Sequence, residues 1–128
     1  MIKRIIEVSI KPILIIGGLA TALAGLNAFL PQFAVENIQN LEWTSEYTIF
    51  VQHWGIMVCL MGLFMVAAAF KESWRAPILL YSLLEKAFMV FLVTSNAEHS
   101  FAEGFYIPAS MDAFLTLYLI LYFINKRA

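Results

Sequence analysis

The chain has 128 residues, of which 62% are hydrophobic and only 13% are charged, and its formal net charge is −1. Soluble domains carry about 25% charged residues, so this composition cannot build a water-facing surface and excludes an ordinary soluble domain. A lipid bilayer would supply the missing apolar solvent. Because each transmembrane helix needs about 20 apolar residues, the chain has room for about four spans and no second domain.

Four apolar segments predict four transmembrane helices joined by short connections. We expect these spans at about residues 13–30, 47–70, 78–95 and 109–124. Residues 1–12 are basic and predict a cytoplasmic lead-in or a short surface helix, with Pro12 in the first turn of the first span, where its missing donor costs nothing. The predicted fold class is all-α: one four-helix transmembrane bundle over residues 1–128, with antiparallel neighbours.

The first two spans are joined by residues 31–46, which mix apolar and acidic side chains. Pro31 ends the first span, and we expect an interfacial segment with Trp43 at headgroup depth. Thr44 or Ser45 is the expected cap of the second helix. Within the first span, Gly17, Thr21 and Gly25 recur every four residues, as do Gly18 and Ala22. This spacing predicts a face of small residues where another helix approaches closely.

The basic residues outside the spans all fall on one side of the predicted bundle: Lys3, Arg4, Lys11, Lys71, Arg75, Lys126 and Arg127. The connections on the other side carry five acidic residues and no basic one: Glu36, Glu42, Glu46, Glu98 and Glu103. Short basic segments stay in the cytoplasm, so we expect a multi-pass protein of the inner (cytoplasmic) membrane with both termini cytoplasmic.

Polar residues inside the spans are costly in hydrocarbon and therefore indicate a candidate site. At a rise of about 1.5 Å per residue, His53 lies about 9 Å inside the outer end of the second span, and Asp112 lies at a similar depth in the fourth. If they face each other, the carboxylate can orient the imidazole for acid–base chemistry. The alternative is a structural hydrogen bond that locks the second and fourth spans together. Asn27 and Asn96 end the first and third spans on the same side.

Glu85 and Lys86 are adjacent at mid-span, where neither charge is ordinary. Glu85 shares a helix face with Asn96, and Tyr118 in the fourth span is placed to donate to it. Lys86 points about 100° away, so it either snorkels toward the cytoplasm or pairs across the bundle with another acid; we favour the interior role. His53, Asp112 and Glu85 are thus the candidate catalytic residues. The expected ligand-binding residues are Asn27, Trp54, Lys86, Asn96 and Tyr118.

His53, Met57, Met61 and Met65 are spaced by four, which would suit a copper path, but the stripe rotates by about 40° at each step. We therefore expect no metal and no cofactor. Cys59 is the lone cysteine and is expected to pack in the core. No basic patch supports binding of nucleic acid.

The glycine-rich first span ending at Pro31, the run HWGIMVCLMGLFMVAAAF and the turn at 75–77 give a layout that resembles DoxX-like four-helix bacterial membrane proteins. The resemblance covers most of the chain and implies a four-span bundle in a bacterial cytoplasmic membrane, without a mechanism.

Three functions fit the sequence. The first is a non-catalytic membrane protein that binds a lipid or another hydrophobic small molecule, or serves as an accessory subunit. The second is an enzyme performing acid–base chemistry on a lipid-soluble, isoprenoid-like substrate. The third is a proton-coupled carrier or channel with Glu85, Lys86 and His53 as a relay; because four helices enclose little lumen, it would need a homo-oligomer. Membrane lipids are the expected partners in each case.

Overall fold

The computed structural model describes residues 1–127 of the chain, with the side chain of Arg127 left out of the description. Within this range the chain is helical and contains no β-strand. The α-helices are α1 (Ile2–Ala22), α2 (Gly25–Phe29), α3 (Pro31–Asn37), α4 (Thr48–Phe70), α5 (Arg75–Ser95) and α6 (Tyr106–Arg127). Three short 3-10 helices connect them: η1 (Ser45–Tyr47), η2 (Glu72–Trp74) and η3 (Ser100–Phe105).

Four helical segments are long and apolar enough to cross a membrane, which confirms the predicted all-α four-span bundle. They comprise residues Ile2–Phe29, Ser45–Phe70, Glu72–Ser95 and Ser100–Lys126. Each begins earlier than the apolar pattern indicated, because 3-10 turns and polar helix ends extend the spans beyond their apolar centres. The α-helices of the third and fourth spans, α5 and α6, begin at Arg75 and Tyr106, so Pro77 and Pro108 lie inside their first turns.

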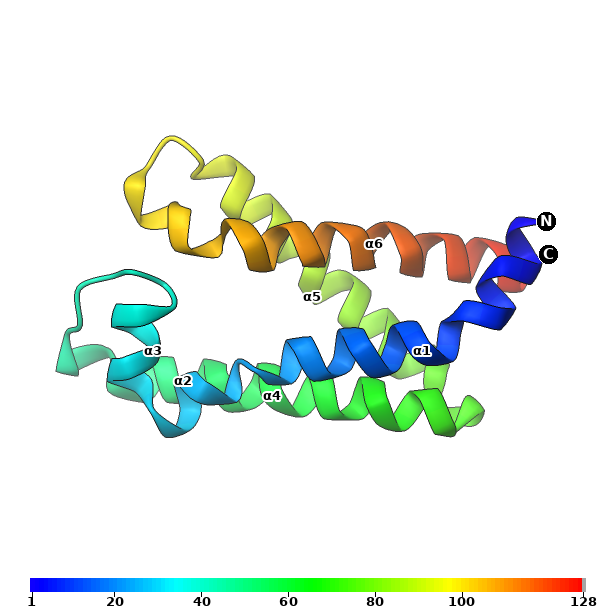
Figure 1. Ribbon diagram of the computed structural model, residues 1–128, viewed down its shortest axis with the longest axis horizontal. Coiled ribbons are helices and arrows are strands. Elements are labelled where there is room, and N and C mark those ends of the chain that lie inside the picture. Colours follow the sequence, from blue (N-terminus) through cyan, green and yellow to red (C-terminus); the bar gives the residue numbers. More distant parts are fainter. Residues whose placement is uncertain (128) are drawn as a thin grey trace.

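The predicted position of Pro12 is wrong: it lies in the interior of α1 and not in its first turn. Ile6, Ile10 and Leu14, spaced by four, form one buried stripe on both sides of the proline. Packing of this stripe keeps the helix continuous although the proline removes one backbone hydrogen bond. The first turns of α1 bend away from the axis of the rest of the helix (Figure 1).

The four long helices form two closely packed pairs, α1 with α4 and α5 with α6. The two termini lie at the same end of the bundle (Figure 1). At that end the buried core includes Leu14, Met65, Leu79 and Leu119. Arg75 reinforces it by donating from Nε to the Ala68 carbonyl (2.8 Å) and from a terminal nitrogen to the Ala69 carbonyl (2.9 Å), which satisfies the end of α4.

Glycines allow the backbones of α1 and α4 to come into direct contact, which confirms the predicted close approach. A Cβ on Gly18 would lie 2.5 Å from the Gly62 carbonyl oxygen, and a Cβ on Gly62 would overlap Gly18 in turn. Farther along, a Cβ on Gly55 would lie 2.5 Å from the backbone nitrogen of Ala28. At these positions only glycine permits the two backbones to meet.

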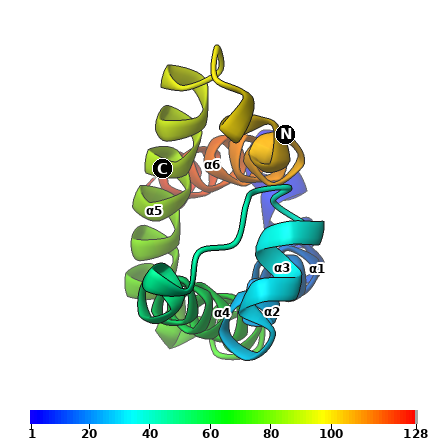
Figure 2. The same ribbon diagram turned by 90° about the vertical axis from the view of Figure 1, so that its left-hand side faces the viewer.

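At the end opposite the termini, residues 38–44 cross the middle of the ring formed by the helices (Figure 2). Gln39 in this connection is buried, and its backbone packs directly against Gly104 of η3. Asn40 has a φ of 56°, a left-handed conformation that asparagine tolerates. The connection therefore covers the bundle instead of only lying at the interface. The expected cap by Thr44 or Ser45 is wrong, because η1 intervenes and α4 begins at Thr48 without a side-chain cap.

Candidate functional site

The first span changes its winding where it reaches the candidate site. Between α1 and α2, backbone amides bond three residues back: Leu23 to Ala20 (3.3 Å) and Ala24 to Thr21 (3.2 Å). Leu26 repeats the pattern by bonding to Leu23 (3.0 Å). Such 3-10 bonds tighten the helix and rotate the residues after them relative to a regular α-helix. Thr21 before the tightened segment and Asn27 after it are both buried.

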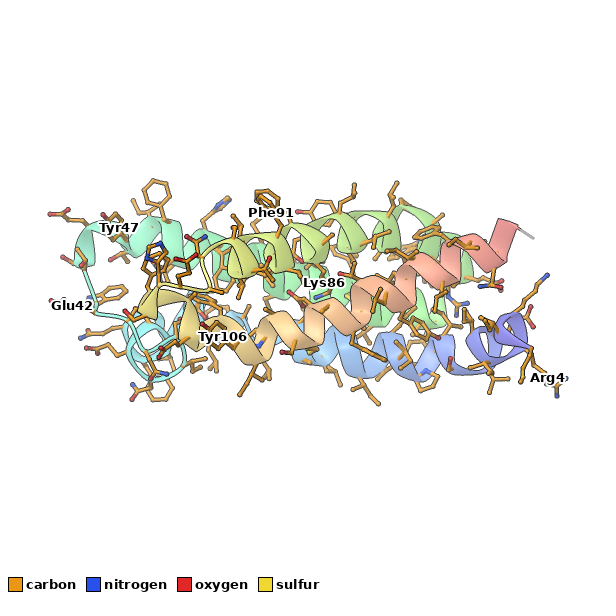
Figure 3. All side chains as sticks on the ribbon, turned by 90° about the horizontal axis from the view of Figure 1, so that it is seen from above. Arg4, Glu42, Tyr47, Lys86, Phe91 and Tyr106 are labelled. Atoms are coloured by element: carbon orange, nitrogen blue, oxygen red, sulfur yellow. The ribbon has the colours of Figure 1, made fainter. Side chains whose placement is uncertain are left out.

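A buried ion pair lies at the level of Thr21. Lys86 on α5 is 1% exposed, and its Nζ donates to Asp112 Oδ1 on α6 (3.0 Å) and to Thr21 Oγ1 (2.9 Å). The Thr21 hydroxyl in turn donates to the Gly17 carbonyl (2.7 Å). In Figure 3, Lys86 points into the bundle whereas Phe91 on the same helix points outward. This arrangement confirms the favoured interior position of Lys86.

Glu85, the neighbour of Lys86, has a different environment. Its side chain is partly buried, and its Oε2 atom is buried without a hydrogen-bond partner among the described residues. A buried carboxyl oxygen that bonds to nothing is destabilising by about 1–3 kcal/mol, so it needs a ligand, a proton or a water to offset that cost. The unpartnered oxygen makes Glu85 the least satisfied polar group of the site.

Glu85, Lys86 and Asp112 line an inner cavity of about 290 Å³ between the helices. Other walls come from Thr21 and Ala24 of the first span, from Trp54 and Val58 of α4, and from Met89, Phe105 and Met111. Leu23 and Ile107 also line it and are 66% and 85% exposed. Because these two apolar residues lie on the outer surface of the bundle, the cavity opens sideways, between the first span and α6.

An outer cavity of about 430 Å³ adjoins the inner one toward the end covered by residues 38–44. The two share Asn27, Gln39, Trp54, Met89 and Phe105 as lining residues. Asn27 and Gln39 form a reciprocal amide pair, with Asn27 Nδ2 to Gln39 Oε1 at 2.9 Å and Gln39 Nε2 to Asn27 Oδ1 at 3.3 Å. This pair attaches the covering connection to the first span, at the boundary between the two cavities.

Most of the expected site residues therefore converge. Asn27, Trp54, Glu85, Lys86 and Asp112 line the inner cavity. Asn96 lines the outer one, although its side-chain amide donates to the Leu92 carbonyl of its own helix (2.8 Å). The convergence follows from the level that these residues share along their spans.

Two expected pairings are wrong. Asp112 does not pair with His53, because Lys86 holds its carboxylate and His53 lies exposed on α4, outside the lining of both cavities. Tyr118 does not reach Glu85, since its hydroxyl is 2.6 Å from Ser9 Oγ and 3.4 Å from the Ile6 carbonyl. Ser9 lies nearer the termini, so Tyr118 belongs to the core at that end.

Sequence reasoning missed two residues of the site. Thr21 was recognised only as a small residue of the helix face, yet its hydroxyl is a direct partner of Lys86. Gln39 lies in a connection and was not considered, although its burial and its amide pair hold that connection in place. The signal for Thr21 was its level, about 12 Å before the end of the first span at Phe29, in the same part of the bundle as Asp112.

The chemistry available to the inner cavity is that of two carboxyl groups, one ammonium group, a hydroxyl and apolar walls. No group of three or more His, Cys, Asp or Glu side chains within residues 1–127 is placed to hold a metal ion. Comparison of the chain with protein-family models, curated proteins and solved structures gave no match. The resemblance to DoxX-like proteins therefore stays a prediction.

Proposed function

We propose that this protein is a small integral protein of the inner membrane that binds a hydrophobic small molecule inside its helix bundle. The observation that carries the proposal is the pair of adjoining cavities, about 290 and 430 Å³, with apolar walls around a few convergent polar groups. Small-molecule sites have this character and this range of size. The basic end of the bundle, with both termini, is proposed to face the cytoplasm.

The route into the site supports a ligand that comes from the bilayer. Exposed apolar residues, Leu23 and Ile107, form part of the inner cavity's lining between the first span and α6. The outer cavity likewise includes Phe50 and Leu92, which are 75% and 40% exposed. A hydrophobic molecule dissolved in lipid can enter through such rims without crossing water. The covered end, closed by residues 38–44, limits entry along the axis of the bundle.

The other two functions have less support from the geometry. Acid–base catalysis by His53 with Asp112 lacks its pair, since Asp112 is bound to Lys86 and His53 lies outside the cavities. A proton relay from Glu85 and Lys86 to His53 has the same difficulty, because His53 lies outside the cavities. The polar residues that do line the cavity are placed to recognise a ligand.

Binding is measurable through Trp54, which lines both cavities. We would replace Trp43 and Trp74 by Phe, reconstitute this background protein in nanodiscs, and titrate it with 4-bromo-neopentylbenzene, a neutral probe whose bromine quenches indole fluorescence on contact. Saturable quenching is the expected result. Val58→Phe, which fills the inner cavity, should weaken it, whereas Leu60→Phe on the exposed surface of the same helix should not. Linear quenching that is equal in both variants would refute the proposed cavity site.

A further inference from the structure

We propose that the ligand of the inner cavity is a hydrophobic cation, bound against Glu85 in exchange for a proton. This inference rests on the proposed function and specifies the ligand class of the same site. It follows from the charges around the cavity, from the unpartnered oxygen of Glu85 and from the aromatic walls.

The charged groups of the inner cavity do not balance. Lys86 and Asp112 lie 3.0 Å apart and compensate each other. Glu85 lines the same cavity and has no basic residue left to pair with. The elements packed against α5 here contribute neutral side chains, including Thr21 and Ala24 of the first span, Asn27 of α2 and Val58 of α4. Among the described lining residues the site is therefore one positive charge short of holding an ionised Glu85.

An isolated charge in an apolar cavity is expensive, and a proton on Glu85 would remove that cost in the empty site. A cationic ligand offers the same compensation. The exchange balances: the protonated carboxyl and the cation become a carboxylate–cation pair, and one proton leaves to water. Opposite charges attract strongly in a low-dielectric surrounding, so the cation stabilises the ionised carboxylate of Glu85.

The remaining walls suit a cation better than an anion. Trp54 and Phe105 line the cavity, and the faces of such aromatic rings attract cations. An anionic ligand would have to compete with Asp112 and Thr21 for the Lys86 ammonium and would lie beside two carboxyl groups. A neutral ligand with a carbonyl oxygen could accept a hydrogen bond from protonated Glu85, and this alternative has the opposite pH dependence.

The test uses two probes of nearly equal shape. The cation is (4-bromobenzyl)trimethylammonium, and the neutral probe is 4-bromo-neopentylbenzene, in which a carbon replaces the ammonium nitrogen. Both are titrated against Trp54 fluorescence in the same nanodiscs. Because each bound cation displaces one proton, its Kd should fall by up to about tenfold per pH unit between about pH 6 and about pH 8. The Kd of the neutral probe should stay constant over the same range.

The variants separate charge from fold. Glu85→Gln should weaken cation binding at least tenfold and abolish its pH dependence, while leaving binding of the neutral probe intact. Glu85→Asp keeps the charge and should keep the pH dependence, and Glu98→Gln, an exposed connection residue, should change neither probe. If Glu85→Gln does not fold, the pH profile of the unsubstituted protein decides alone.

The outcomes distinguish the two proposals. If the neutral probe binds saturably and the cation does not, the cavity site stands and the cation proposal fails. The cation proposal also fails if cation binding is flat with pH, or if Glu85→Gln leaves it unchanged. If neither probe binds, the proposed function fails and takes this inference with it.

Discussion

Lys86 and Asp112 form an ion pair at 3.0 Å between α5 and α6, with side-chain exposures of 1% and 10%. Thr21 adds a third helix to the contact by accepting from Lys86 at 2.9 Å. One lysine thus connects three of the four spans at a single level. Such groups are costly in a membrane unless they are paired, so the pair is both a constraint on the fold and the polar part of the inner cavity.

The first prediction concerns the coupling of this pair. Lys86→Met should destabilise the bundle by about 3–5 kcal/mol, because it leaves the Asp112 carboxylate buried without a counter-charge. Asp112→Leu should also destabilise the bundle, because it leaves the Lys86 ammonium buried without a counter-charge. The double variant should recover most of the loss, since both desolvation costs disappear together. The measurement is a double-mutant cycle of unfolding free energy in mixed detergent micelles.

Lys126→Met is the matched control, because Lys126 is exposed and its Nζ donates to the Tyr122 hydroxyl (3.2 Å). Its effect should stay below about 1 kcal/mol. Equal destabilisation by the single and double variants would show that the pair has no coupling energy and that the two residues act separately.

The depth of each site residue along its span could be predicted from the sequence. The direction in which its side chain points around the helix axis could not. A fixed rise per residue placed His53 and Asp112 at similar depth, and both belong to the same third of the bundle. Which way each side chain points depends on the order in which helices pack. Since α6 pairs with α5, Asp112 meets Lys86, whereas His53 turns outward on α4.

The second prediction concerns the glycine contact of α1 with α4. Gly62→Ala should destabilise the bundle by about 1–3 kcal/mol, because the added Cβ meets backbone atoms of Gly18 and Ala22 that cannot move independently. Gly17→Ala is the control: its Cβ would meet only the ends of the Leu115 side chain, at 3.1 and 3.2 Å. Unfolding free energies that are equal for the two variants would contradict the backbone contact.

The glycine spacing was sufficient to predict a close helix approach but not its partner. Gly18 meets α4, whereas Gly17, one residue earlier, faces Leu115 of α6. A one-residue step turns a helix position by about 100°, so small changes of rotation select different neighbours. Pro12 also shows that tertiary packing can override local sequence preference. Proline favours the start of a helix, but the packing of Ile6, Ile10 and Leu14 keeps α1 helical on both sides of it.

The third prediction concerns the orientation of the bundle in the membrane. In a Cys59→Ala background, a cysteine at Glu42 should react with a membrane-impermeant maleimide in intact spheroplasts, and a cysteine at Lys71 should react only after lysis. Both positions are exposed, and they lie in connections at the two ends of the second span. The physical reason is that basic connections of membrane proteins tend to stay in the cytoplasm, and Lys71 and Arg75 belong to the basic side of this bundle, whereas the charged residues in the connection of Glu42 are all acidic. Labelling is read by mass shift on a gel. The reverse pattern would place both termini outside and would mean that the covered end, with the outer cavity, lies toward the cytoplasm.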